Sequence, residues 1–163
     1  MKTKSLLLMA AACASFCSPF MARAQNSQAL KPGQIAPADI VEQVQNQNPV
    51  KIGSVSVRTL PPSSTRAQSG GSEQSTLVLR STDNLIGVSA NELVVIYKEP
   101  KAVQLKVGEW LKDATVKTYE DHGLVVIRLK RFADIQPLQL RLAELFPGAR
   151  FDLPVTYFRN EAR

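Results

Sequence analysis

Glu92-Leu-Val-Val-Ile-Tyr97 opens the most regularly patterned part of the chain, which continues to residue 158. β-Branched and aromatic side chains dominate this short run, and that composition predicts a strand. Glu99-Pro100 ends the run, and Pro100 fits the first turn of a helix, where its missing N–H is not needed. Apolar residues then recur at helical spacing, which predicts a helix with one buried side and a tryptophan in the core. They are Val103, Val107, Trp110 and Leu111.

A hairpin pattern follows this helix. Thr115–Tyr119 has the alternating side-chain pattern of a strand and so predicts a second strand. Glu120-Asp-His-Gly123 has the composition of a turn, because Gly123 tolerates the positive φ that tight turns need. Residues 124–129, with the sequence Leu-Val-Val-Ile-Arg-Leu, then predict a third strand antiparallel to the second.

A second helix and a fourth strand complete the pattern. Asp134 is a candidate N-cap, and Pro147-Gly148 is a stop signal at the other end of the helix. Residues 150–158 predict an imperfect final strand. The order β-α-β-β-α-β predicts an α+β fold of the ferredoxin-like type, with a four-stranded antiparallel sheet and two helices on one face. The apolar stripe of the second helix comprises Ile135, Leu138, Leu142 and Leu145.

The N-terminus has the features of a signal peptide. Lys2 and Lys4 precede a run of apolar residues, and Ala22-Arg23-Ala24 supplies an Ala-x-Ala cleavage sequence. We therefore expect residues 1–24 to be removed near Ala24-Gln25. The mature protein would then be periplasmic or secreted.

The removed segment also holds both cysteines and three basic residues. Cys13 and Cys17 would leave with it, so we expect no thiol, disulfide or cysteine-based metal site; a lipoprotein anchored through either cysteine is the alternative. The formal net charge of +6 falls to +3 without Lys2, Lys4 and Arg23. The remaining basic residues are spread out, which indicates a solvated surface and no nucleic-acid partner. No later run approaches the roughly 20 apolar residues of a membrane span.

The stretch between the leader and the main pattern is weakly patterned. Residues 38–44 could form a short helix and residues 50–57 edge strands, while residues 61–72 are rich in Pro, Ser and Gly, which favours a linker. Residues 76–88 predict a small hairpin, whose pairing with the main sheet the sequence leaves open. The expected organisation is a signal peptide (1–24), a low-order N-terminal segment and linker (25–75), a folded domain (76–158) and a C-terminal tail (159–163).

Residues that could carry enzyme chemistry are few. His122 is the only histidine and falls in the predicted turn, beside Glu120 and Asp121, where solvent would keep both carboxylates ionised. The chain contains no nucleophile elbow and no Gly-rich phosphate loop. An acylphosphatase-like enzyme of the same fold would need such a loop, and Glu99-Pro-Lys101 does not supply one. We therefore expect no enzyme activity, no metal and no cofactor.

The first and third predicted strands are apolar on both sides. Two helices cover only one face of a sheet, and a wet second face should alternate apolar with polar residues. The second face therefore needs a cover, which could be the N-terminal segment, a homodimer or a partner protein. Alternation divides the side chains of the two strands into two sets, one with Leu93, Val95, Tyr97, Val125, Ile127 and Leu129 and the other with Val94, Ile96, Leu124 and Val126.

Taken together, these elements resemble a known family. Asn91-Glu-Leu-Val-Val-Ile-Tyr-Lys98, the Trp110 helix, the hairpin of residues 115–129 and residues 135–158 resemble the propeptide domain of subtilisin-like serine proteases, a family that includes stand-alone inhibitors and folding chaperones. The likeness covers residues 91–158 and consists of a pattern of elements rather than an invariant motif.

The resemblance implies roles for particular residues. In that family the open sheet face packs on two helices of the protease. The resemblance gives this role to Val94, Ile96, Leu124 and Val126. An acid near the last strand caps those helices; Asp152 is the candidate, one position away from the usual place, where Leu153 stands. The tail then enters the active-site cleft like a product. The implied cleft-binding residues are Pro154, Val155, Thr156, Tyr157, Phe158 and Arg163.

Two functions are therefore expected as alternatives. The first is an exported, propeptide-like protein that acts in trans on a subtilisin-like protease, because no protease domain follows Arg163. It would serve as inhibitor, folding chaperone or both. The second is a non-enzymatic assembly or dimerisation module of the cell envelope that uses the sheet for association.

Overall fold

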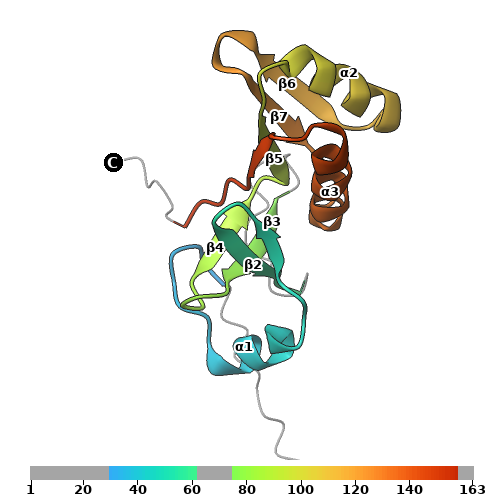
Figure 1. The fold of residues 1–163 in the computed structure, drawn as a ribbon. Helices are drawn as coiled ribbons and strands as arrows, with labels where there is room; N and C mark the ends of the chain where they lie inside the picture. The colour runs from blue at the N-terminus through green and yellow to red at the C-terminus, as the bar shows by residue number, and fades with distance from the viewer. Residues whose placement is uncertain (1–29, 62–74, 158–163) are drawn as a thin grey trace, which may run out of the picture.

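The computed structural model describes residues 30–61 and 75–157 (Figure 1). These residues form a mixed α+β fold, which confirms the predicted fold class, with three α-helices and two four-stranded antiparallel sheets. Two short 3₁₀ turns, Glu120–His122 and Phe132–Asp134, lie between elements. In chain order the elements are α1 (Ala38–Gln45), β1 (Val50–Ile52), β2 (Val55–Thr59), β3 (Thr76–Arg80), β4 (Ile86–Ser89), β5 (Glu92–Ile96), α2 (Pro100–Trp110), β6 (Thr115–Tyr119), β7 (Leu124–Arg128), α3 (Ile135–Leu145) and β8 (Arg150–Asp152).

The C-terminal sheet has the strand order β6-β7-β5-β8 and is antiparallel throughout. Gly123 (φ 61°) closes the β6–β7 hairpin, and a Cβ at this position would lie 2.9 Å from the Tyr97 carbonyl oxygen. A larger residue there would therefore strain the turn and push it away from β5. The last strand ends at Asp152 and is shorter than the expected 150–158, because Pro154 has no N–H to donate and the chain leaves the sheet.

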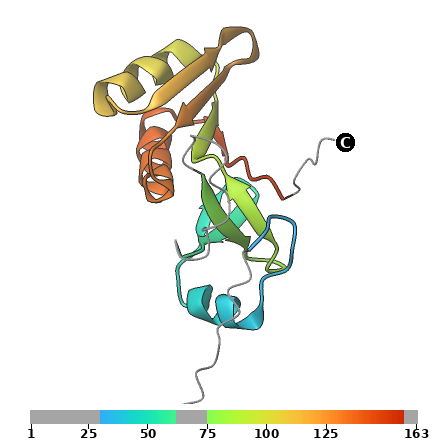
Figure 2. The same ribbon diagram turned by 180° about the vertical axis from the view of Figure 1, so that it is seen from behind.

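One side of this sheet is buried by both long helices (Figure 2). Leu93 and Val95 of β5, with Val125 and Ile127 of β7, are 0% exposed. Burial of this apolar surface is the main favourable contribution to folding of this half. The helix residues in the same hydrophobic cluster are Val103 and Val107 of α2 and Ile135, Leu138 and Leu142 of α3.

The N-terminal sheet, of order β1-β2-β3-β4, departs most from the expectation. The hairpin predicted at residues 76–88 is present, but it pairs with β2 and not with the C-terminal sheet. Residues 30–61 contain the short helix and the two strands that the sequence suggested, but these elements are part of an ordered sheet, and the expected boundary after residue 75 divides that sheet. Local patterns could not reveal this, because β2 meets β3 only across residues 62–74.

Both faces of the N-terminal sheet are covered. On one face, Leu79 and Ile86 pack with Val44 of α1 in a small hydrophobic cluster. On the other, Val57 and Val78 belong to the large cluster that contains the α2 and α3 side chains. The two halves therefore share one core, and both views show the N-terminal sheet between α1 and the C-terminal half (Figures 1 and 2).

Three predicted roles in the helices hold only in part. Asp134 is the N-cap residue of α3, as predicted, but its side chain makes no capping hydrogen bond, because its carboxylate accepts from the Arg131 guanidinium at 2.7 and 2.9 Å. Leu145 is 49% exposed and lies outside the core. Trp110 is only half-buried at the end of α2, where the Arg141 guanidinium carbon lies 3.7 Å from its ring centroid. This cation–π contact covers a face of the Trp110 ring that would otherwise be exposed to solvent.

Candidate functional site

The side of the C-terminal sheet away from the helices carries a continuous apolar patch. Val94 lies opposite Val126 and Ile96 opposite Leu124, so the four side chains form two cross-strand pairs on the two central strands. All four are partly exposed, whereas their neighbours along the same strands are fully buried. We call these four residues the open face, and they are the residues expected from the sequence.

The N-terminal half does not cover the open face. The four side chains of the open face are absent from both hydrophobic clusters of the described residues, and none of them packs against a cluster. The N-terminal sheet instead joins the cluster on the helix side of the C-terminal sheet, through residues such as Val57 and Val78. The sequence left three possible covers for this face: the N-terminal segment, a homodimer or a partner protein. The described N-terminal residues, 30–61 and 75–90, are not the main cover.

Polar and charged side chains surround the open face. Register places Lys117 of β6 opposite Val126, and Arg150 of β8 opposite Ile96. The Arg128 guanidinium donates to the Glu92 carboxylate at 2.7 and 2.9 Å, which forms an ion pair across the end of β5 and β7. An apolar centre with a charged rim is the usual composition of a protein–protein interface. Sequence reasoning missed this rim because only the pairing register reveals it.

Asp152 lies at the edge of the open face. It is exposed and stands opposite Val94 in the β5–β8 pairing. Its Oδ1 accepts a hydrogen bond from the Leu153 N–H at 2.9 Å, which fixes the carboxylate at the point where β8 ends. The expected capping acid is therefore beside the open face and is exposed to an approaching partner.

The described tail residues that were expected to enter a protease cleft lie beside the N-terminal sheet. Thr156 pairs with Val88 at the edge of β4, and the two residues exchange N–H···O=C bonds of 2.8 and 2.9 Å. Tyr157 lies under the Arg80 guanidinium, whose carbon is 4.5 Å from the ring centroid. Residues 154–157 are therefore packed on the N-terminal sheet, and the cleft-binding role expected for Pro154, Val155, Thr156 and Tyr157 would require them to leave it. Phe158 and Arg163 lie outside the described residues.

Burial and pairing change two ionisation equilibria at this tail. Desolvation raises the pKa of the Tyr157 hydroxyl. The hydrogen bond from Arg80 lowers the pKa of the Asp83 carboxyl, and the Arg80 Nε donates to Asp83 Oδ1 at 2.8 Å. Arg80 is thus held in place between an acid and an aromatic ring.

The residues considered for enzyme chemistry lie together in an exposed turn. His122, Glu120 and Asp121 are exposed in the β6–β7 turn, and Glu120 pairs with Lys101 at 2.9 Å. No group of three or more metal-ligating side chains occurs in residues 30–61 and 75–157. The turn therefore forms no candidate catalytic site.

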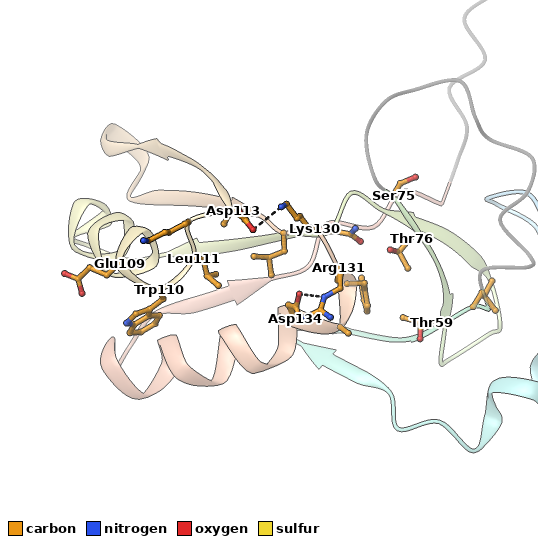
Figure 3. A pocket seen from close by; sticks show the side chains of 17 residues that line it. Thr59, Ser75, Thr76, Glu109, Trp110, Leu111, Asp113, Lys130, Arg131 and Asp134 are labelled. Atoms are coloured by element: carbon orange, nitrogen blue, oxygen red, sulfur yellow. Dashed lines mark hydrogen bonds and ion pairs between the residues drawn. The ribbon is translucent and has the colours of Figure 1, made fainter.

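A groove of about 1310 Å³ runs between the end of α2, the start of α3 and the N-terminal sheet (Figure 3). Its walls carry two ion pairs, Lys130 with Asp113 at 3.0 Å and Arg131 with Asp134 at 2.7 Å. These charges neutralise each other, so the groove offers no concentrated charge for an ionic ligand. The open face remains the better candidate site.

Comparisons with family models, with curated proteins and with solved structures each gave no match. Among the described residues no helix is long and apolar enough to cross a membrane. The function must therefore be argued from the open face and the arrangement of elements around it.

Proposed function

We propose that this protein is an exported, propeptide-like protein that binds a subtilisin-like serine protease as an inhibitor, a folding chaperone or both. The observation that carries the docking step is the open face: Val94, Ile96, Leu124 and Val126 are partly exposed and contiguous on the central strands. The class of partner comes from the resemblance of residues 91–158 to the protease propeptides. Export rests on the leader-like sequence of residues 1–24.

The arrangement of the C-terminal half supports a ferredoxin-like fold of the propeptide type. Its strand order is β6-β7-β5-β8, and α2 and α3 contribute to one cluster on one side of the sheet. This leaves the opposite side available for two packed helices of a protease. Asp152, exposed at the rim, is positioned to accept from unpaired N–H groups at the start of such a helix.

Binding of this kind would stabilise the folded protease. A ligand that binds the native surface and not the unfolded chain shifts the folding equilibrium by mass action. The open face needs no rearrangement to dock, because its side chains are fixed by the paired strands beneath them. The segment that reaches the cleft would begin after Tyr157, since residues 154–157 are held on β4.

The test uses the chain from Gln25 with a panel of secreted subtilisin-like proteases from the source genome and a trypsin-like protease as control. We expect inhibition and a higher yield of refolded protease from the subtilisin-like group alone. The variant Val126→Asp should weaken inhibition about a hundredfold, the effect of losing a buried interface anchor. Leu105→Asp, the same kind of change at a 70% exposed position on α2, should alter it less than about threefold.

The result decides between docking and other uses of the fold. No inhibition, no complex and no refolding gain with any member of the panel would overturn the protease proposal. Equal effects of the two aspartate variants would show that the open face is not the docking surface.

A second candidate, an assembly module of the cell envelope, is favoured by the outer edge of β6. Among the described residues this strand pairs only with β7, and its exposed edge carries Lys117. An open edge can accept a strand from another chain. Self-association in light scattering that persists in Val126→Asp, together with no protease binding, would favour this candidate.

A further inference from the structure

The chain leaves β8 and crosses from the C-terminal sheet to the N-terminal sheet. Leu153 is 1% exposed and belongs to the large hydrophobic cluster, so it fixes the start of the crossing. Residues 154–157, which we call the strap, then run beside β4. Val88 donates its N–H to the Thr156 carbonyl at 2.8 Å, and Thr156 donates to the Val88 carbonyl at 2.9 Å. The strap thus adds one antiparallel residue pair to the edge of the N-terminal sheet.

Gly87 of the N-terminal sheet leaves space for two strap side chains, Val155 and Tyr157, and we call this position the seat. A Cβ built at Gly87 would lie 2.5 Å from Val155 Cγ1 and 2.8 Å from Tyr157 Cε1. Real side chains do not approach so closely, so only glycine at this position leaves room for both residues. Arg80 covers the Tyr157 ring at 4.5 Å and is itself held by Asp83. The seat therefore recognises a β-branched residue and, two positions later, an aromatic residue.

The strap is held much less firmly than the strands of either sheet. It forms one bridged pair, whereas β5 and β7 form five. Pro154 has no N–H, which prevents the ladder from extending towards β8. The Tyr157 hydroxyl is buried without a hydrogen-bond partner among the described residues, which costs free energy. Such a segment opens locally at a small fraction of the free energy of global unfolding.

We propose that Gly87, Val88 and Arg80 form a peptide-binding site for an extended segment with the pattern Val-x-Tyr, and that the strap is its resident, separable ligand. Backbone hydrogen bonds to Val88 give the site its strand-like mode of binding, and the seat at Gly87 gives it side-chain selectivity. When the strap leaves, the Val88 N–H and C=O become free and can accept the same segment from a second chain, while Ile86 on the same edge stays bonded to Gly33 and Gln34. This inference does not rest on the identity of any protein that docks on the open face.

The first test frees the site in the full chain and offers the ligand separately. Thr156→Pro removes the strap's donor to Val88 and should detach it. A capped hexapeptide that copies residues 152–157 should then bind saturably in a fluorescence titration. The double variant Thr156→Pro, Gly87→Ala should bind it about tenfold more weakly or worse. The same peptide with proline in place of threonine is the matched control ligand and should not bind.

Absence of saturable binding by a folded Thr156→Pro chain would overturn the proposal, as would unchanged binding by the double variant. Folding of each variant is read from the protected amides of β5 and β7.

The second test needs no variant. In the wild-type chain the Thr156 amide should exchange with solvent about a hundredfold faster than the Val95 amide, because the strap opens without the core. Equal exchange rates would show that the strap opens only when the whole protein unfolds, and the site would then be part of the core.

Discussion

The two sheets of this protein have similar strands and differ in what covers them. In the N-terminal sheet, Leu79 faces α1 and Val78 faces the shared core, so each face is covered by a hydrophobic cluster. In the C-terminal sheet, Val125 is fully buried under the helices while its neighbour Val126 is partly exposed on the open face. The apolar content of a strand therefore does not reveal whether its second face is covered within the chain.

The difference also separates folding from recognition. Side chains on the helix side of the C-terminal sheet stabilise the fold by their burial, and those on the open face contribute less because they are partly exposed. The N-terminal sheet makes no such distinction, because both of its faces belong to a hydrophobic cluster. Variants at neighbouring positions can test this contrast directly.

The largest expected effect contrasts two adjacent residues of β7. Ile127→Ala should lower the free energy of unfolding by about 3 kcal/mol, because it leaves a cavity under the helices. Val126→Ala should cost less than about 1 kcal/mol, because its side chain is partly exposed. Urea denaturation measures both values. Equal costs would mean that the open face is covered in the monomer.

A smaller effect is expected at the strap seat. Gly87→Ala should cost about 1–3 kcal/mol, because its methyl group would overlap Val155 and Tyr157. Gly108→Ala is the matched control, since no atom lies within 4 Å of a Cβ built there. That change should stabilise α2 by about 0.5–1 kcal/mol through helix propensity. Thermal unfolding compares the stability of the two variants. A stabilised Gly87→Ala variant would contradict the close packing of Val155 and Tyr157 on Gly87.

Strap attachment should depend on pH at the alkaline end. Burial raises the pKa of Tyr157, so the folded state favours the neutral hydroxyl. The resulting stability is fully present below the unfolded pKa of about 10 and is lost as pH rises through the higher folded value. Absorbance at the tyrosinate band should show one tyrosine titrating late. Tyr157→Phe should abolish that late phase and leave the strap in place; its persistence in the variant would assign it to another tyrosine.

The smallest effect concerns the rim of the open face. Glu92→Gln removes one charge of the pair with Arg128 and should cost about 0.5 kcal/mol, because both side chains retain contact with solvent. Denaturation at low and high salt should show the loss only at low salt. A loss of several kcal/mol would mean that the rim is buried, which would weaken the contrast between the two sheets.

The sequence predicted the open face for a simple reason. Side chains alternate strictly along a strand, so the run from Leu93 to Ile96 and the run from Leu124 to Ile127 each place two apolar residues on either side, and the resemblance indicated which side is open. A different local signal, the tolerance of glycine for positive φ, located the hairpin turn at Gly123. Both features depend on residues close together in the chain.

The features that the sequence could not predict all join distant residues. The strap looked like the end of a fourth strand, because Val155 and Tyr157 continue an alternating pattern, yet they pack on Gly87. Nothing local to Gly87 distinguishes a seat from an ordinary loop or strand glycine. Trp110 looked like a fully buried residue on its helical stripe, but it is half-buried against the large cluster, and Arg141 of another helix covers its ring.

The crossing of the strap determines how the protein would respond to a pull on its C-terminus. The contact between Arg80 and the Tyr157 ring would carry the load first, followed by the two hydrogen bonds of the single pair Val88–Thr156, as the segment peels from β4. Force would next reach Leu153, which is locked among core side chains, and the three paired residues of β8. The molecule would therefore lengthen at its end under a weak tension while both sheets remained intact.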